Sequence, residues 1–258
     1  VIIVNFGFNV SATKNVSIYR DDKNKLNEIV TGVLLIKGIL FVVSFSLLML
    51  FLHIFAYEHK VLFYICMWMC FYEFIFPIWY FQGIEKMGYI TFLTLISRVI
   101  FLVLIFIFVK SPSHFLLVPI INGIGALIAG VFSVYIIIFK HRIRFRKIKF
   151  INLVSYLRES YMLFLTDVIM AFKDKTNVIF ISFFLGNGAV AEFDLAVKIK
   201  DLLFIPVNMI NQAIYPKVSR DKNMKYMLKV LRISLISLTL GTVLLFPFID
   251  DVILVLGG

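Results

Sequence analysis

Charged side chains within apolar segments are the groups of this sequence most able to bind or move another molecule. Such groups are costly in membrane hydrocarbon, so they face a water-filled cavity, pair with one another or bind a substrate or an ion. The positions that carry these hypotheses are Lys37, Glu73, Arg98, Asp167, Lys173, Asp174, Lys175 and Lys198. Their roles depend on the segments that hold them.

The composition excludes a soluble globular protein. Of the 258 residues, 61% are hydrophobic and 16% are charged, and the mean hydropathy is +0.98. A soluble fold cannot cover such a composition with a polar surface. At roughly 20 apolar residues per helical crossing, the chain has room for about eight membrane helices. The sequence therefore predicts an all-α integral membrane protein.

The charge balance and the absence of sequence motifs argue against several functions. The excess of 26 Lys and Arg over 15 Asp and Glu lies mostly between the apolar segments, where it sets membrane orientation rather than binding nucleic acid. Cys66 and Cys70 are too few for a disulfide framework or a metal site. The sequence contains no metalloprotease, phosphate-binding-loop or nucleophile-elbow motif. We therefore predict neither an enzyme nor a cofactor.

Apolar runs bounded by charge, Gly or Pro predict the membrane helices. A partial span covers Val1 to Ala12, and the full spans are 33–55, 61–81, 89–109, 115–139, 161–185, 189–215 and 230–256. Lys and Arg collect on the cytoplasmic side of membrane proteins. Alternate loops on one side hold eighteen of them, and the loops on the other side hold only Lys60 and Lys110. This count supports a crossing at 189–215 although its first half is polar.

A short internal repeat extends this topology. The stretch Val16–Lys25 is echoed at Val218–Lys225 with six helix positions between them, although two basic loops could also match by chance. A six-helix repeat predicts a twelve-helix, two-lobe transporter, of which this chain is a fragment of about eight helices. The predicted parts are an N-terminal lobe at residues 1–139 without its first helix, a basic cytoplasmic linker at 140–160, and the start of a truncated C-terminal lobe at 161–258.

One stretch of the sequence resembles a known family. The P-x-W-x-F-Q-G-x-E-x-M pattern of bacterial polysaccharide flippases of the O-antigen (Wzx) type is matched by Pro77, Trp79, Phe81, Gln82, Gly83, Glu85 and Met87, followed by Arg98. Segments 5–14 and 192–219 resemble other recurring stretches of that family, with Asn5 in place of an expected acidic residue. The resemblance covers nearly the whole chain.

The resemblance implies a function in glycan export. In this family, part of the multidrug/oligosaccharidyl-lipid/polysaccharide exporter superfamily, two lobes flank a central cavity. They carry a polyprenyl-pyrophosphate-linked oligosaccharide across the bacterial inner membrane by alternating access. We also expect contact with membrane lipids and other glycan-assembly membrane proteins, and coupling to H⁺ or Na⁺. Two alternatives stay open, an exporter of drugs or small cations from the same superfamily and a membrane glycan polymerase.

For such a cargo, the first three charged positions each have two interpretations. Arg98 faces the pyrophosphate, or it forms a buried ion pair with Glu73 at nearly the same depth. Glu73 is otherwise a candidate for ion coupling. Lys37 lies about one turn from the cytoplasmic end of its predicted span. From there, snorkelling to the lipid headgroups is favoured over substrate binding.

The span after the basic linker is the most polar. Asp167 and Asp174 are seven residues apart and share a helix face. We expect Lys173 and Lys175 to attract phosphate or acidic sugars, and one of the aspartates to bind the coupling ion. Alternatively, these groups neutralise one another locally. Lys198 in the next span is a further candidate for substrate binding or an interfacial residue.

Overall fold

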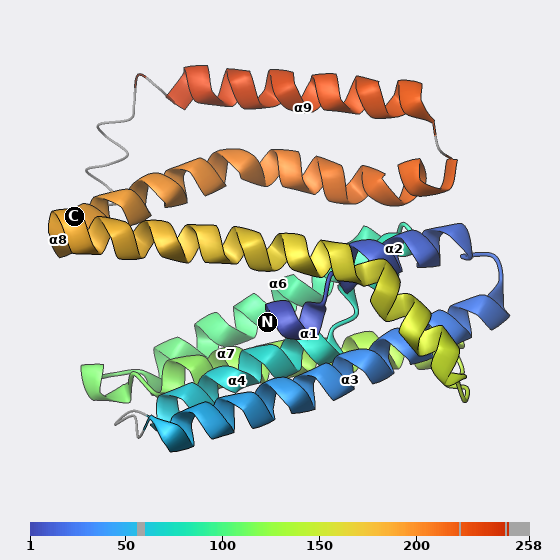
Figure 1. Cartoon of the computed structure of the whole chain (residues 1–258), viewed down its shortest axis with the longest axis horizontal. Coiled ribbons are helices and arrows are strands. Elements are labelled where there is room, and N and C mark those ends of the chain that lie inside the picture. The colour runs from blue at the N-terminus through green and yellow to red at the C-terminus, as the bar shows by residue number, and fades with distance from the viewer. Residues whose placement is uncertain (56–59, 222, 246, 248–258) are drawn as a thin grey trace. The chain divides into compact units, whose positions relative to one another are not determined.

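The computed structural model describes residues 1–55, 60–221, 223–245 and 247, and in these residues it consists of helices joined by loops (Figure 1). Six of the helices are long and apolar enough to cross a membrane. The predicted all-α membrane architecture is confirmed.

The N-terminal run, which the sequence predicts to be a partial membrane span, forms two short helices. α1 (Ile2–Asn5) and α2 (Phe8–Ile18) are separated by Phe6 and Gly7, whose φ angles of 47° and 74° are left-handed. A left-handed residue does not continue a right-handed helix, and Gly adopts this conformation readily. The predicted partial span from Val1 to Ala12 is thus divided between two helices.

The next helices follow the predicted spans with shifted ends. Asp22 caps α3 (Lys23–Ile54), because its carboxylate accepts hydrogen bonds from the backbone N–H groups of Asn24 and Lys25. The helix therefore starts well before the predicted 33–55. The others are α4 (Lys60–Ile75), α6 (Met87–Phe108), the short turn η1 (Pro112–His114), α7 (Leu117–Tyr135) and its π-helical continuation η2 (Ile136–Lys140).

A break interrupts the predicted span at 61–81. α4 ends at Ile75, and the short α5 (Ile78–Gly83) begins after Pro77. Proline lacks the N–H group that a continuing helix would need. The sequence pattern that begins at Pro77 therefore forms a separate element.

Two predicted spans are joined in one long helical element. α8 (Phe150–Asp221) consists of two helices that meet at Gly186, where φ is 82° and ψ is 177°. Figure 1 shows α8 turning back on itself. Its two arms contain the predicted spans 161–185 and 189–215. α9 (Met224–Leu245) contains the start of the predicted 230–256, and residues 248–258 lie outside the described residues.

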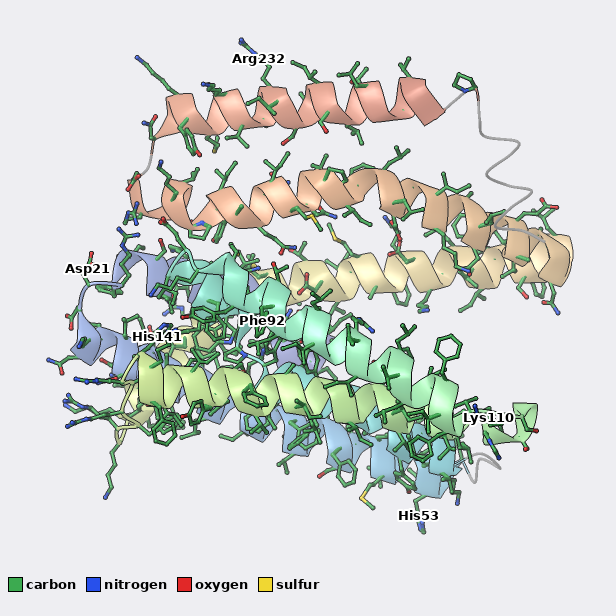
Figure 2. All side chains as sticks on the ribbon, turned by 180° about the vertical axis from the view of Figure 1, so that it is seen from behind. Asp21, His53, Phe92, Lys110, His141 and Arg232 are labelled. Atoms are coloured by element: carbon green, nitrogen blue, oxygen red, sulfur yellow. The ribbon has the colours of Figure 1, made fainter. Side chains whose placement is uncertain are left out.

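The chain folds into two compact units, unit 1 (Val1–Leu165) and unit 2 (Thr166–Gly258). In unit 1, Asp21 and His141 lie at one end of the helices, and His53 and Lys110 lie at the other (Figure 2). We call the end with Asp21 and His141 the basic end, because the Lys- and Arg-rich segment 140–149 begins there.

The core of unit 1 is concentrated at the basic end. Its buried residues are Phe8, Ala12, Val16, Leu26, Ile29, Val30, Val33, Ile36, Trp79, Tyr80, Phe81, Ile137 and Ile143. Farther along the helices, large apolar side chains such as Leu102 and Phe106 are exposed. Apolar side chains on the outside of a membrane helix suit contact with lipid.

Candidate functional site

A polar cavity of about 230 Å³ lies between α4, α6 and α7 of unit 1. α6 places Thr94, Ser97 and Arg98 on one face, because residues three and four apart are neighbours on a helix. α7 approaches α6 closely at Gly125, where an added Cβ atom would lie 2.7 Å from the carbonyl oxygen of Ser97. The lining residues are Val1, Tyr72, Glu73, Thr94, Ser97, Arg98, Asn122, Gly123 and Ala126.

A buried ion pair lies at this cavity. The Lys37 ammonium donates a hydrogen bond to Oε1 of Glu73 at 3.1 Å, and the two side chains are 0% and 15% exposed. The Asn9 amide donates to the same oxygen at 3.5 Å. The predicted snorkelling of Lys37 is therefore wrong, because the Glu73 carboxylate holds its ammonium group inside the unit.

Arg98 has no ion-pair partner among the residues that the structure describes. It lines the polar cavity together with Glu73, but the Glu73 carboxylate is paired with Lys37. The predicted alternative of an ion pair between Arg98 and Glu73 is thus wrong. Because Lys37 neutralises Glu73, the side-chain charge left at the cavity is the positive charge of Arg98. This arrangement suits an anionic ligand.

The charged residues predicted in unit 2 form local, exposed pairs. The Nζ atoms of Lys173 and Lys198 lie 3.5 Å from Asp174 and 3.4 Å from Asp194, and these four side chains are 61–70% exposed. Exposed pairs of this kind contribute little to stability. In the described part of unit 2, Asp167 and Lys175 form no ion pair. That these side chains line a cavity stays a prediction.

Sequence reasoning missed several polar residues of the cavity. Asn9 contacts Glu73, while Tyr72, Thr94, Ser97 and Asn122 contribute to the lining. The spacing of Thr94 and Ser97 relative to Arg98 was the available signal, since it places three polar side chains on one face of an apolar helix. In the described residues, no three His, Cys, Asp or Glu side chains are grouped to hold a metal ion.

The family-like pattern at 77–87 has a packing role in the structure. The residues Trp79, Tyr80, Phe81, Gln82 and Gly83 are all buried against α2 and its neighbours. The hydroxyl group of Thr13 lies 3.2 Å from the carbonyl oxygen of Trp79 and 3.3 Å from Oε1 of Gln82. None of the residues of α5 lines the polar cavity.

Polar contacts hold the first part of α8 to α2 and α3. Glu159 accepts hydrogen bonds from Lys14 at 3.2 Å and Asn15 at 2.8 Å. The hydroxyl groups of Ser11 and Ser160 are 2.6 Å apart. The segment predicted as a basic linker at 140–160 is thus tied to unit 1 by uncharged and acidic side chains at its C-terminal end.

His141 lies where η2 gives way to the segment 141–149, which has no regular secondary structure. Its Nδ1 atom is 3.1 Å from the Tyr80 hydroxyl, and its ring packs beside the rings of Tyr80 and Tyr89. Its Nε2 atom is buried and has no hydrogen-bond partner among the described residues. Burial, together with Lys86 and Lys140, lowers the pKa of the imidazole. The folded protein therefore favours the neutral ring.

This lowered pKa predicts a loss of stability in mild acid. Below the unfolded-state pKa of about 6.5, the unfolded chain binds a proton that the folded chain resists, so stability falls as pH falls. The stabilisation is fully present above that pH. His141→Gln retains a polar group for Tyr80 but does not titrate. Thermal unfolding of both proteins between pH 5 and 8 should show a shallower pH dependence for the variant, and equal slopes would contradict the assignment.

Comparison with known proteins matches the chain to a family and to two transporters. The family model described as "Polysaccharide biosynthesis protein" matches residues 1–222. A "Putative O-antigen transporter" of Escherichia coli (strain K12) is 29% identical over 221 residues, which cover 85% of this chain and 53% of the relative. A "Putative O-antigen transporter" of Shigella dysenteriae is 28% identical over 234 residues, which cover 89% and 58%. The chain thus spans a little over half of the length of these relatives, and no solved structure matches it.

Proposed function

We propose that this chain, which belongs to the polysaccharide biosynthesis protein family, forms part of a flippase for lipid-linked oligosaccharides. The family match confirms the resemblance that the sequence predicted. Both relatives are described as transporters, in agreement with the expectation that the chain is not an enzyme. The substrate is a polyprenyl-pyrophosphate-linked sugar unit, and the membrane is the bacterial inner membrane.

The observation that carries this proposal is the unpaired Arg98 at the polar cavity. A pyrophosphate with a hydrophilic glycan cannot cross about 30 Å of hydrocarbon unaided, so its carrier must offer a polar, cationic surface inside the membrane. Guanidinium groups bind phosphate oxygens through strong charge-assisted hydrogen bonds. Thr94, Ser97 and Asn122 add uncharged hydrogen-bonding groups beside Arg98. These groups suit the phosphate and the adjoining sugar hydroxyl groups.

The same observation weighs against an exporter of drugs or small cations. A cation site should present an available carboxylate, whereas the carboxylate at this cavity is bound by Lys37. Unit 2 extends the proposal to the second lobe of the transporter, where Lys173, Lys175 and Lys198 would attract the anionic cargo. Asp167 and Asp174 are the proposed sites of H⁺ or Na⁺ coupling, and uptake of either ion at Glu73 would require release of Lys37.

The test replaces Arg98 in the full-length protein within a strain that lacks the native gene. Arg98→Ala should lower transport about tenfold or more, because a hydrogen bond to a charged group is lost. Arg98→Lys keeps the charge and should restore part of the activity. The measurements are surface polysaccharide and the cytoplasmic-leaflet pool of single lipid-linked repeat units, which should accumulate.

Lys110→Ala, an exposed change at the opposite end of unit 1 from the basic end, is the matched control and should transport normally. Lys173→Ala and Lys175→Ala in the same assay test the proposed sites of unit 2. Normal surface polysaccharide in Arg98→Ala, with folded protein at the usual level, would refute the role of Arg98. A repeat unit that reaches the outer leaflet but stays unpolymerised would instead indicate a polymerase.

A further inference from the structure

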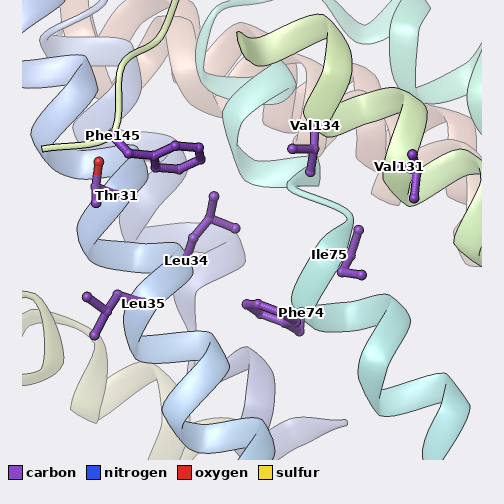
Figure 3. Close-up of a pocket in the computed structure, with 8 residues that line it drawn as sticks. All are labelled: Thr31, Leu34, Leu35, Phe74, Ile75, Val131, Val134 and Phe145. Atoms are coloured by element: carbon purple, nitrogen blue, oxygen red, sulfur yellow. The ribbon is translucent and has the colours of Figure 1, made fainter.

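An apolar groove of about 500 Å³ opens near the basic end of unit 1, apart from the polar cavity (Figure 3). In Figure 3, Leu34 and Leu35 on α3 lie across the space from Phe74 and Ile75 on α4. The groove and the polar cavity share no lining residue. The apolar side chains of the groove are Leu34, Leu35, Phe74, Ile75, Val131, Val134 and Phe145.

The groove lies toward the basic end of the helices that line it. Ile75 is the last residue of α4, and Val134 is the penultimate residue of α7. α4 therefore ends at the groove, and α7 with its continuation η2 ends at Lys140, less than about two turns beyond Val134. Leu35 and Val131 are 44% and 60% exposed, so the groove is open to its surroundings along one side. A flexible hydrocarbon chain could enter it from the bilayer without crossing the polar cavity.

A basic segment forms the rim of this groove. Residues 140–149 contain six Lys and Arg and no Asp or Glu. The segment is fixed against α3, because the backbone N–H of Arg144 donates to Asn27 at 2.8 Å and that of Arg146 donates to Thr31 at 3.3 Å. Phe145 lies between them and lines the groove together with Thr31. A positively charged rim is thus attached directly to an apolar surface.

The charges of this rim are not neutralised. The side chains of Arg144 and Arg146 are exposed, and neither forms an ion pair with any residue that the structure describes. Basic pockets between membrane helices on the cytoplasmic side suit the phosphate of an anionic lipid. Free phosphate would use the rim but not the groove, and an uncharged hydrocarbon would use the groove but not the rim.

We propose that the groove and the guanidinium groups of Arg144 and Arg146 form a binding site for an anionic phospholipid of the cytoplasmic leaflet. One acyl chain occupies the groove, and the phosphate binds at the rim. The transported lipid is a different molecule, because its head must reach the polar cavity, which the groove does not join. The phospholipid would hold the segment 141–149, which connects α7 to α8, against α3.

The test measures lipid binding to the full-length protein by native mass spectrometry. Dioleoyl phosphatidylglycerol should bind at least about tenfold more tightly than dioleoyl phosphatidylcholine, which has the same chains and no net charge. The double change Arg144→Ala and Arg146→Ala should remove most of this preference. The matched control, Lys229→Ala with Arg232→Ala, removes two exposed charges of α9 and should leave it intact.

A second pair of variants tests the groove. Val131→Trp fills it and should weaken binding of phosphatidylglycerol about tenfold by excluding methylene groups. Val99→Trp, on an exposed face of α6 outside the groove, should have no effect. Equal binding of both phospholipids, or unchanged binding in Val131→Trp, would overturn the proposal. Displacement of phosphatidylglycerol by undecaprenyl phosphate but not by inorganic phosphate would assign the groove to the transported lipid instead.

Discussion

Replacing Lys37 with Met should destabilise the protein by about 3–5 kcal/mol, because the Glu73 carboxylate would stay buried without its partner. The ammonium group of Lys37 is fully buried and lies 3.1 Å from Glu73. Among the described residues, the amide of Asn9, at 3.5 Å, is the other hydrogen-bond donor to that carboxylate and carries no charge. The free energy of unfolding in detergent and the yield of folded protein would measure the effect.

The double variant Lys37→Met with Glu73→Gln isolates the pair. It removes both charges at similar side-chain volume, so it should recover most of the lost stability. Lys229→Met removes an exposed charge and should change stability little. If the double variant were as unstable as Lys37→Met alone, the loss would come from packing around Lys37 rather than from an unpaired carboxylate.

The same experiment separates the two interpretations of Arg98. An Arg98–Glu73 pair would make Arg98→Ala as destabilising as Lys37→Met. The observed pairing of Glu73 with Lys37 predicts instead that Arg98→Ala remains folded. Loss of transport in that variant would then be a loss of ligand binding, which is the result that the proposed function requires.

The membrane helices could be predicted from the sequence, but their ends could not. Hydropathy reports the part of a helix that lies in lipid, and it detects the apolar stretch that begins near Val33. α3 starts earlier, at Lys23, because Leu26, Ile29 and Val30, which precede Val33, pack into the core. Lys37 therefore lies about 21 Å from the first residue of α3. In the predicted span 33–55 it lies about one turn from that same end.

The partner of Glu73 could not be predicted for a related reason. Position along a span gives the approximate depth of a side chain, and by this criterion Arg98 matched Glu73. Depth does not give the rotation of each helix about its axis or its neighbours in the bundle. The structure supplies both, and it places Lys37 rather than Arg98 on the Glu73 carboxylate. The apolar groove depends on the same rotation and has no signature in the sequence.

The pattern at 77–87 identified the family without revealing what its residues do. A motif of buried aromatic residues with one Gly is compatible with a binding site or with close packing. The structure favours packing, because Gly83 lies where an added Cβ atom would be 2.5 Å from Cγ1 of Val16 and 2.9 Å from the carbonyl oxygen of Thr13. Only a residue without a side chain allows α5 to approach α2 this closely.

Gly83→Ala should accordingly destabilise the protein by about 1–3 kcal/mol, the usual cost of overpacking a tight contact. The Cγ1 atom of Val16 could adjust, but the Cβ atom of Val16, at 2.6 Å, and the carbonyl oxygen of Thr13 are fixed by the backbone of α2. Gly88→Ala is the matched control, since no atom lies within 4 Å of its added Cβ and Ala favours the helix that begins there. Unfolding of the purified variants would measure both changes.

Combining Gly83→Ala with Val16→Ala isolates the contact with the Cγ1 atom of Val16. The smaller side chain removes the contact between the added Cβ atom and Cγ1 of Val16, and it leaves the contacts with Cβ of residue 16 at 2.6 Å and with the Thr13 carbonyl oxygen. The Val16→Ala change should therefore cost somewhat less in the Gly83→Ala background than alone. Strictly additive losses would show that α5 has moved away from α2 as a whole. A Gly83→Ala protein as stable as Gly88→Ala would contradict the close packing of these two helices, and with it the packing role of the pattern.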